Sequence, residues 1–381
     1  MRVLIIGHTY MLDINRDKFY ELAKNPGIEL TIVTPRKWKT DLYVMECEKP
    51  RNDSVRVVPL RCLLTGLESF YIYGFGLLKI ICKLKPDIIH VEQGADAFSY
   101  FQAIFFSKLF SRRSRGVFFT WVNWDTRIKF PLTFFEKYNL RHSNCAVCGN
   151  HDAARILKKK SFRGLIKVLP QLGVDLNFFN KMDVDDLRKS LGIDGFCVGF
   201  LGRYVEEKGL LLLLEACSQI KGKINILLVG DGPLKPKLIE EANRLELSSE
   251  LILVPPVMNE YVVPYINCMD VLVLPSFEVS TWKEQFGHIL IEAMACGVPV
   301  IGSSSGEIPN VIGDAGLIFK EKDAQDLREK IEQVMNDRNL AGELAKKGID
   351  RVREKYTHRK IADETLSIYE ELLCRTQDKK I

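Results

Sequence analysis

Glu284 and Glu292 are the residues of this sequence whose types and spacing most directly suggest chemistry. Glu284 lies just before the predicted start of a helix at Phe286–Gly287, and Glu292 lies about two turns inside that helix. The unpaired amides at a helix start bind anions such as phosphate. With this spacing, one carboxylate can reach a sugar beyond a bound phosphate while the other accepts hydrogen bonds from a ribose.

The neighbouring segments place this helix at the edge of a sheet. An apolar strand is predicted over residues 271–274 and ends in Pro275-Ser276, and the helix is predicted to close at Gly297. The amides of Gly287 and His288 would then face the carboxyl end of a strand. This is the edge at which open α/β sheets bind ligands.

A short loop carries two cations after another predicted strand. The strand over residues 197–201 ends at Gly202, and Arg203 and Lys208 flank the loop that follows. Guanidinium and ammonium groups on one loop suit a diphosphate, because arginine can bind two of its oxygens at once. The alternative is a pair of surface charges balanced by Glu206-Glu207.

The elements that must position these residues alternate along the chain. In the N-terminal half, apolar runs predict strands separated by amphipathic helices, near residues 2–6, 29–33, 55–59, 88–91, 117–120 and 146–148. After a Pro- and Gly-punctuated segment the alternation restarts, with strands predicted over 197–201, 224–229, 251–254, 271–274 and 298–301. Near-continuous apolar strands separated by helices indicate parallel sheets that are covered on both faces. The predicted fold class is α/β, with two tandem Rossmann-like doubly wound domains that face a central cleft.

The domain boundaries follow from this restart. A chain of 381 residues fits two or three domains, at roughly 100–200 residues each. We expect a first domain over residues 1–172 and a second over residues 173–357. Residues 358–381 contain an amphipathic helix that we expect to pack back toward the first domain.

Composition excludes several classes of protein. The chain is 46% apolar and 27% charged, which is ordinary for a globular protein, and no apolar run reaches the roughly 18 residues of a membrane-spanning helix. The ten cysteines are scattered through apolar contexts, as in proteins of a reducing compartment. We therefore expect a cytoplasmic protein that associates at most peripherally with the inner face of the membrane.

The positive charge is mild overall and concentrated at one place. The net charge is +5, and the sequence contains no nucleic-acid-binding motif, so no nucleic-acid partner is expected. Arg112, Arg113 and Arg115 follow the aromatic run 105–110 on one predicted helix. Such a segment could lie on an anionic membrane surface. The alternative is a core-facing helix with a solvated basic end.

Taken together, these motifs resemble glycosyltransferase family 4. The resemblance rests on the pair Glu284 and Glu292 and on the segments 202–203, 207–209, 230–233, 275–276 and 299–300. In the N-terminal half, residues 85–91 and 169–175 match less tightly. The family consists of retaining, nucleotide-sugar-dependent transferases of the GT-B architecture. The resemblance implies transfer of a sugar from a nucleotide-diphosphate sugar to a glycan or lipid-linked acceptor, in cell-surface polysaccharide or glycolipid synthesis.

The resemblance also implies roles for particular residues. Arg203 and Lys208, beside Gly202, would bind the donor diphosphate and stabilise the charge of the leaving group. Glu284 would contact the donor sugar and is, with these two cations, a predicted catalytic residue. The remaining predicted donor contacts are Phe286, Gly287 and His288 through backbone amides, Glu292 on the ribose hydroxyls and Val257 near the base. The family usually acts without a metal, so we expect no metal and no other cofactor.

The sequence departs from the family pattern at three places. Gly7-His8-Thr9 stands where many relatives have a glycine pair, and His8 could contact the donor sugar or the acceptor, or cap the loop. Asn123 stands where many relatives have a histidine, and it can bind a hydroxyl but cannot act as a base. Residues 277–283 lengthen the segment before Glu284, which would reshape the sugar pocket. Gly7, His8 and Asn123 are the predicted acceptor-side or sugar-contact residues.

Two other functions fit the same architecture. One is a nucleotide-sugar epimerase, and the other is a sugar-binding accessory subunit without activity. The two glutamates and two cations of the donor-side motifs favour transfer. Asn123 in place of a histidine keeps the inactive subunit open as an alternative.

Overall fold

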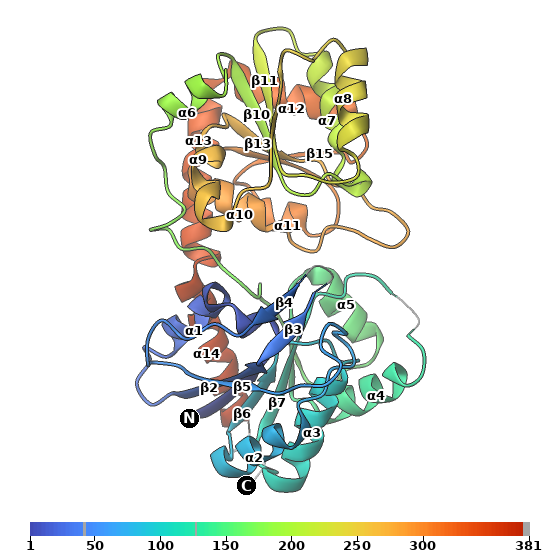
Figure 1. Cartoon of the computed structure of the whole chain (residues 1–381), viewed down its shortest axis with the longest axis vertical. Helices are drawn as coiled ribbons and strands as arrows, with labels where there is room; N and C mark the ends of the chain where they lie inside the picture. Colours follow the sequence, from blue (N-terminus) through green and yellow to red (C-terminus); the bar gives the residue numbers. More distant parts are fainter. Residues whose placement is uncertain (41–42, 126–127, 376–381) are drawn as a thin grey trace. The chain divides into compact units, whose positions relative to one another are not determined.

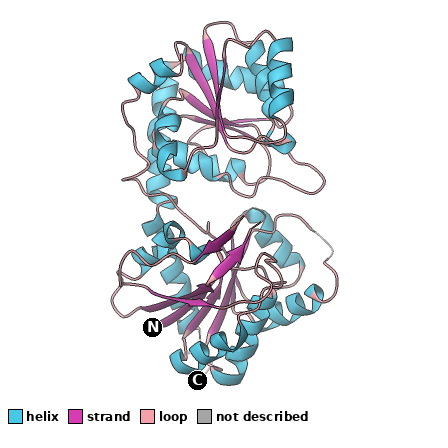
Figure 2. Ribbon diagram, in the orientation of Figure 1, coloured by secondary structure: helices cyan, strands magenta, loops and turns pink. Residues whose placement is uncertain are grey.

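The computed structural model describes residues 1–40, 43–125 and 128–375, and the chain divides into two compact units. The first unit comprises residues 1–173 together with the segment that begins at residue 358. The second unit comprises residues 174–357. Each unit is built from a parallel sheet with helices on its faces (Figure 1, Figure 2).

The sheet of the first unit has the strand order β5-β2-β1-β6-β7-β8-β9, and every neighbouring pair is parallel. Its strands are β1 (Arg2–Ile6), β2 (Glu29–Pro35), β5 (Arg56–Leu60), β6 (Ile88–Val91), β7 (Arg115–Thr120), β8 (Cys145–Cys148) and β9 (Leu165–Val168). The central strands are apolar and buried, because helices cover both faces of a parallel sheet. A separate antiparallel ribbon is formed by β3 (Lys37–Lys39) and β4 (Val44–Glu46).

Two helical layers enclose this first sheet. The helices are α1 (Asp17–Leu22), α2 (Gly74–Leu84), α3 (Phe98–Phe110), α4 (Leu132–His142), α5 (His151–Lys159) and α14 (His358–Cys374), with the short 3₁₀ turns η1 (Thr9–Met11) and η2 (Asp13–Arg16). One apolar core joins the sheet to α2, α3 and α5, and another joins it to α1 and α14. In Figure 1, α14 is the red helix beside the blue α1. Ile361, Tyr369 and Leu372 of α14 are buried in that second core.

The sheet of the second unit has the order β12-β11-β10-β13-β14-β15 and is parallel throughout. Its strands are β10 (Phe196–Leu201), β11 (Ile224–Val229), β12 (Leu251–Val254), β13 (Val271–Leu274), β14 (Val300–Ser303) and β15 (Leu317–Phe319). The helices are α6 (Asp185–Ser190), α7 (Leu210–Ser218), α8 (Lys235–Arg244), α9 (Val262–Asn267), α10 (His288–Ala295), α11 (Ile308–Ile312), α12 (Ala324–Asn336) and α13 (Arg338–Lys355), with the 3₁₀ turns η3 (Glu206–Lys208) and η4 (Asn259–Tyr261).

The end of α10 shows how local chemistry fixes an element that matters for the site. Gly297 adopts a left-handed conformation with φ of +72°. Its N–H donates to the Met294 carbonyl at 3.0 Å, and the Val298 N–H donates to the Ala293 carbonyl at 3.0 Å. This pair of bonds is the glycine-terminated helix end that the sequence predicts at Gly297.

Each sheet has one point at which the order of its connections reverses. In the second unit this point lies between β10 and β13, and in the first unit it lies between β1 and β6. The loops that leave two such strands turn to opposite sides, which opens a ligand crevice at the carboxyl ends of the strands. The fold therefore points to the loops after β10 and β13, and to the loops after β1 and β6.

The two predicted doubly wound parallel sheets are confirmed, whereas several short strands were not predicted. The ribbon of β3 and β4 and the edge strands β9 and β15 are only three or four residues long, too short for a clear periodicity. The prediction that one helix carries the basic cluster is wrong. The helix α3 ends at Phe110, Arg112 and Arg113 lie exposed in the following turn, and Arg115 is the first residue of β7.

Serine hydroxyls explain why the chain turns before those arginines. The Ser114 hydroxyl is buried and donates to the Pro86 carbonyl at 2.5 Å, which ties the turn to the start of β6 and competes with continued helix.

Among the helices of the described residues, none combines the length and the apolar character needed to cross a membrane.

Candidate active site

Lys208 and Glu284 meet at the switch point of the second unit. The Lys208 Nζ atom lies 2.5 Å from Glu284 Oε2, and the Ser276 hydroxyl donates to the same oxygen at 2.9 Å. The two charged side chains come from the loops after β10 and β13. The Lys208 side chain is 16% exposed and the Glu284 side chain is 9% exposed. The fold thus places a cation and a fixed carboxylate where sheets of this kind bind ligands.

Backbone contacts hold these two loops together. The Phe277 N–H donates to the Glu207 carbonyl oxygen at 2.9 Å. Gly209 follows η3 with φ of +69°, and a Cβ atom at this position would lie 2.1 Å from the carbonyl oxygen of Pro275. Only glycine accepts both the conformation and the close approach. The backbone therefore fixes the separation of the loops that carry the ion pair.

Trp282 also contacts this ion pair, although the sequence analysis gave it no role. Residues 277–283 contain a tight turn in which Val279 and Trp282 form an antiparallel bridge. The turn brings the Trp282 ring under Lys208, with Nζ 4.9 Å from the ring centroid. This cation–π contact is a second restraint on the ammonium group. In the sequence, only the lengthened segment of residues 277–283 pointed to this contact. Its length predicted a reshaped pocket but did not indicate which side chain would contact Lys208.

The start of α10 follows Glu284 of the ion pair closely along the chain. Gly287 is the residue before α10, with φ of +81°, and a Cβ atom there would lie 2.8 Å from Leu274 Cδ2. Phe286 is buried, with its ring 4.8 Å from the His288 ring and 5.7 Å from the Tyr356 ring. The start of α10 therefore packs against Leu274, the last residue of β13, although the loop of residues 275–287 joins the two elements.

Burial changes the ionisation of two residues of α10. It lowers the pKa of His288 to about 4, an effect that the nearby Glu284 charge only partly offsets. It raises the pKa of Glu292 to about 7. His288 is therefore neutral at neutral pH and can both donate and accept hydrogen bonds. Glu292 is present in both protonation states at neutral pH.

Replacing Glu292 with glutamine is expected to stabilise the chain at alkaline pH. Because the folded chain holds the Glu292 proton to about pH 7 and the unfolded chain loses it near pH 4.5, the free energy of unfolding falls as the pH rises between these values. Glutamine does not ionise, so thermal melts should show Glu292→Gln more stable than wild type at about pH 8, by about 2–3 kcal/mol. Near pH 4.5 the difference should vanish.

A matched control for this prediction lies on α8. Glu240 is exposed, and Glu240→Gln should follow the wild-type pH profile. Equal stability of Glu292→Gln and wild type at both pH values would contradict the raised pKa of Glu292.

Arg203 and Val257 lie outside this contact network. Arg203 shares the loop with Lys208, but its side chain is exposed and forms no hydrogen bond or ion pair with any residue in the described ranges. Gly202 packs closely at the base of that loop, where a Cβ atom on Gly230 would lie 2.0 Å from the Gly202 carbonyl oxygen. Val257 is half-buried in the loop after β12, and β11 separates β12 from β10.

His8 lies at the corresponding switch point of the first unit. The Gln93 side chain, from the loop after β6, places Nε2 2.6 Å from His8 Nδ1. The His8 ring stacks on Trp38 with centroids 4.5 Å apart, and Glu68 Oε1 lies 3.8 Å from His8 Nε2. Burial lowers the pKa of His8 below its ordinary value, and Glu68 partly offsets this. The structure thus presents an oriented imidazole at the carboxyl edge of the first sheet.

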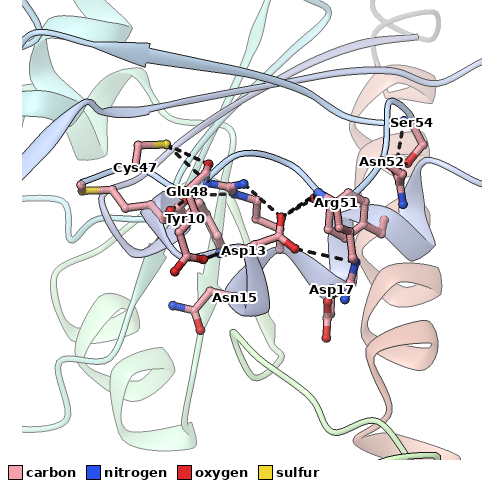
Figure 3. Close-up of polar contacts among 12 residues, drawn as sticks. Tyr10, Asp13, Asn15, Asp17, Cys47, Glu48, Arg51, Asn52 and Ser54 are labelled. Carbon is pink, nitrogen blue, oxygen red and sulfur yellow. Dashed lines mark hydrogen bonds and ion pairs between the residues drawn. The ribbon is translucent and has the colours of Figure 1, made fainter. Parts of the chain in front are cut away.

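A buried arginine fixes the loop that follows His8. The Arg16 side chain is fully buried and donates to the carbonyl oxygens of Tyr10 at 2.7 Å, Met11 at 2.8 Å and Glu48 at 2.9 Å. Its Nη1 atom also lies 3.1 Å from Asp13 Oδ1. The Arg51 N–H donates to the same oxygen at 3.3 Å, and Figure 3 shows Asp13 beside Arg51. Because irregular backbone must find partners for its carbonyls when buried, this guanidinium replaces the hydrogen bonds that a regular element would supply.

Gly7 and Asn123 are the other residues predicted for the acceptor side. Gly7 follows β1 directly, and a Cβ atom there would lie 3.1 Å from Glu92 Cβ, so the small residue lets the loops after β1 and β6 approach each other. Asn123 follows β7 and is only 2% exposed. The structure therefore does not present Asn123 at the surface, and its predicted contact with a hydroxyl stays a prediction.

The side chains that could bind metals are dispersed. Within the described ranges, no group of three or more His, Cys, Asp or Glu side chains could hold a metal ion. All ten cysteines are free thiols. Whether the reaction proceeds without a metal stays a prediction.

Comparison with known families finds a match in the second unit. Residues 183–351 match the family described as glycosyl transferases group 1. The matched segment lies entirely within the second unit, which is therefore similar to group 1 glycosyl transferases over most of its length. Over 192 residues the chain is 32% identical to the capsular polysaccharide biosynthesis glycosyltransferase CapM of Staphylococcus aureus. The aligned residues cover 49% of this chain and 49% of CapM. The chain spans about half the length of the curated relatives it matches.

Solved structures extend the likeness to the whole fold. Sucrose-phosphate synthase from Thermosynechococcus elongatus matches with a TM-score of 0.72 and 21% identity, covering 98% of this chain and all of that one. HepE from Anabaena, solved with UDP, matches with a TM-score of 0.74 and 16% identity, covering 97% of this chain and 100% of HepE. These likenesses show the GT-B fold of two Rossmann-like domains.

Proposed function

We propose that this chain is a retaining glycosyltransferase. It transfers a sugar from a nucleotide-diphosphate sugar to a glycan or lipid-linked acceptor in the synthesis of a cell-surface polysaccharide or glycolipid. The observation that carries the proposal is the ion pair of Lys208 and Glu284 at the switch point of the second unit. CapM, named for capsular polysaccharide biosynthesis, and HepE, solved with UDP, support the same class of reaction.

The donor would bind along the loops after β10 and β13. Lys208 is the cation for the diphosphate, and Arg203, whose side chain is exposed, turns in from the same loop when the diphosphate is bound. The amides at the start of α10 bind the same anion. Glu284, held by Lys208 and Ser276, faces the sugar, and Glu292 accepts hydrogen bonds from the ribose.

The reaction then depends on positioning and electrostatics. The bond between the anomeric carbon and the phosphate oxygen breaks, and the acceptor oxygen forms a bond to that carbon on the same face of the sugar. The acceptor proton passes to the departing phosphate oxygen, so no protein base is needed. Negative charge grows on the diphosphate as this bond breaks, and the Lys208 ammonium lowers the energy of that charge in a partly buried site.

The acceptor side of the proposal rests on the first unit. His8 is a neutral, oriented hydrogen-bonding group there, and it would bind an acceptor or sugar hydroxyl. A lipid-linked acceptor requires contact with a membrane, and we place that peripheral contact at Arg112, Arg113 and Arg115, on the cytoplasmic face.

The proposal is tested first with donors alone. A panel of nucleotide-diphosphate sugars is screened by thermal shift, because a ligand that binds the folded chain raises its melting temperature. The donor that binds is then incubated with glycan and lipid-linked acceptors, with and without a metal chelator, and the anomeric configuration of the product is read by NMR. We expect a product with the donor's configuration, formed equally with the chelator.

Each alternative gives a different result in the same experiment. An epimerase would change the sugar of the donor without any acceptor, and an inactive accessory subunit would bind the donor without turnover. A product of inverted configuration would contradict retention. Absence of a shift with every donor would contradict the donor site.

A further inference from the structure

A broad basic cavity lies in the first unit, at the edge of the sheet opposite His8. Its volume is about 1080 Å³, and it opens at the amino ends of β7, β8 and β9, where Arg115, Asn144 and Leu165 line it. The carboxyl ends of these parallel strands point the other way, so the cavity is separate from the acceptor-side edge.

Six cations line this cavity, and none of the described residues that line it is acidic. They come from β7, α4, the segment that joins α5 to β9, and the end of the chain's last described helix: Arg115, Lys137, Arg141, Lys160, Arg163 and Arg375. Two have carboxylate partners, because Lys160 lies 2.5 Å from Glu136 and Arg375 lies 2.6 Å from Glu371. The described lining therefore brings six cations and no carboxylate side chain together.

Three of the other cations have no visible counter-ion. Lys137, Arg141 and Arg163 form no ion pair with any carboxylate in the part of the chain that is described. Like charges gathered in one concavity destabilise the folded chain unless an anion joins them.

Helix ends account for only part of this charge. A cation in the last turn of a helix offsets the partial negative charge of the helix end, which explains Arg141 at the end of α4 and Lys160 after α5. Arg115 begins a strand, Lys137 lies in the middle of α4 and Arg163 lies in the loop before β9. Helix-end electrostatics gives no reason for these three to converge on one hollow.

We propose that this basic cavity binds a multiply charged phosphate-bearing ligand, either the headgroup of an anionic lipid or a soluble phosphorylated molecule. Arg141 and Arg163 supply planar donors that bind two phosphate oxygens each, and Ser143 and Asn144 add polar groups to the wall. The volume is large enough to admit a ligand of headgroup size. The proposal does not depend on the reaction proposed for the other edge of the sheet.

Inorganic pyrophosphate tests the charge recognition directly. Its binding is measured by calorimetry with wild type, with the cavity variant Arg141→Gln/Arg163→Gln and with the control Lys79→Gln/Lys83→Gln, which removes the same charge from exposed positions of α2 outside the cavity. We expect the cavity variant to lose at least about tenfold in affinity and the control to change by less than about twofold. Both variants keep Lys208, so any binding of pyrophosphate at that residue is the same in both. The difference between their pyrophosphate affinities therefore reports on the cavity alone.

Vesicles then distinguish the two sources of phosphate. Cosedimentation is measured with phosphatidylcholine vesicles and with vesicles that also contain phosphatidylglycerol. A loss of binding to the anionic vesicles in the cavity variant assigns the cavity to a lipid headgroup, and unchanged vesicle binding with weakened pyrophosphate binding assigns it to a soluble phosphate. Equal pyrophosphate affinity in the cavity variant, the control and wild type overturns the proposal. If the double variant does not fold, Lys137→Gln replaces it in the same comparison.

Discussion

Replacing Lys208 with methionine or Glu284 with glutamine is expected to lower kcat/KM by on the order of 10² to 10³ while the chain still folds. Lys208→Met removes the ammonium that would stabilise the departing diphosphate and leaves the Trp282 ring without its cation. Glu284→Gln keeps the shape of the side chain but removes the charge that holds Lys208 at 2.5 Å. Both changes act on the transition state, so we expect kcat to fall with kcat/KM.

The double variant separates a shared role from two independent roles. The two side chains restrain each other. The kcat/KM of Lys208→Met/Glu284→Gln should therefore be only slightly lower than that of the less active single variant. Independent roles would instead multiply the two losses.

Lys221 offers a matched control for this series. It is an exposed lysine of the same unit, in the segment before β11 at the amino ends of the sheet. Lys221→Met should keep kcat within about twofold of wild type, as expected for an exposed charge far from the site. Melting temperatures are measured for every variant. A folded Lys208→Met or Glu284→Gln chain with near-normal turnover would remove the ion pair from the proposed mechanism.

The sheets of this chain could be predicted because each long strand is a continuous apolar run. In β10 and β11 the apolar run extends through almost the whole strand, since both faces of the sheet are buried. The strands of β3, β4 and β15 could not be predicted, because three residues do not define a period and their pairing depends on partners elsewhere in the chain.

The candidate site could be predicted where its residues follow directly from a strand or open a helix. Gly287 and His288 are of this kind, because they open α10. The ion pair between Lys208 and Glu284 was not predicted, because it joins loops that are 76 residues apart and depends on β10 lying next to β13. The contact of Trp282 was missed for the same reason. Its position is set by the turn of residues 277–283 and not by its spacing along the chain.

The first unit contains a charged pair that no local pattern indicates. Lys18 of α1 and Glu92, which follows β6, are separated by 74 residues, and their Nζ and Oε1 atoms lie 2.6 Å apart. Their side chains are 4% and 0% exposed. A lysine and a glutamate are the residues that sequence patterns assign to the surface, so a buried pair of this kind becomes visible only when the sheet and α1 are assembled.

Replacing Lys18 with methionine is expected to destabilise the chain by about 3–5 kcal/mol, because it leaves the Glu92 carboxylate buried without its cation. In the native chain burial alone would raise the pKa of Glu92, but the Lys18 charge, aided by His90, outweighs burial and holds this pKa below its ordinary value. The loss should also disturb the acceptor-side edge, since Glu92 contacts Gly7 and its neighbour Gln93 holds His8.

The pH dependence of this loss identifies its cause. Without Lys18, burial raises the pKa of Glu92, so the folded variant binds more protons than its unfolded chain and the free energy of unfolding falls as the pH rises above about 4.5. The deficit of Lys18→Met relative to wild type should therefore be larger at about pH 8 than at about pH 5. A deficit caused only by lost packing would be the same at both pH values.

A surface pair of equal length provides the control for this prediction. Lys24 Nζ also lies 2.6 Å from a carboxylate oxygen, that of Glu21, but the Lys24 side chain is 68% exposed. Lys24→Met should cost less than about 1 kcal/mol, because water already solvates both charges. Adding Glu92→Gln to Lys18→Met removes the buried charge and should restore much of the lost stability. A Lys18→Met deficit no larger than that of Lys24→Met would show that burial of the Lys18–Glu92 pair contributes nothing to the fold.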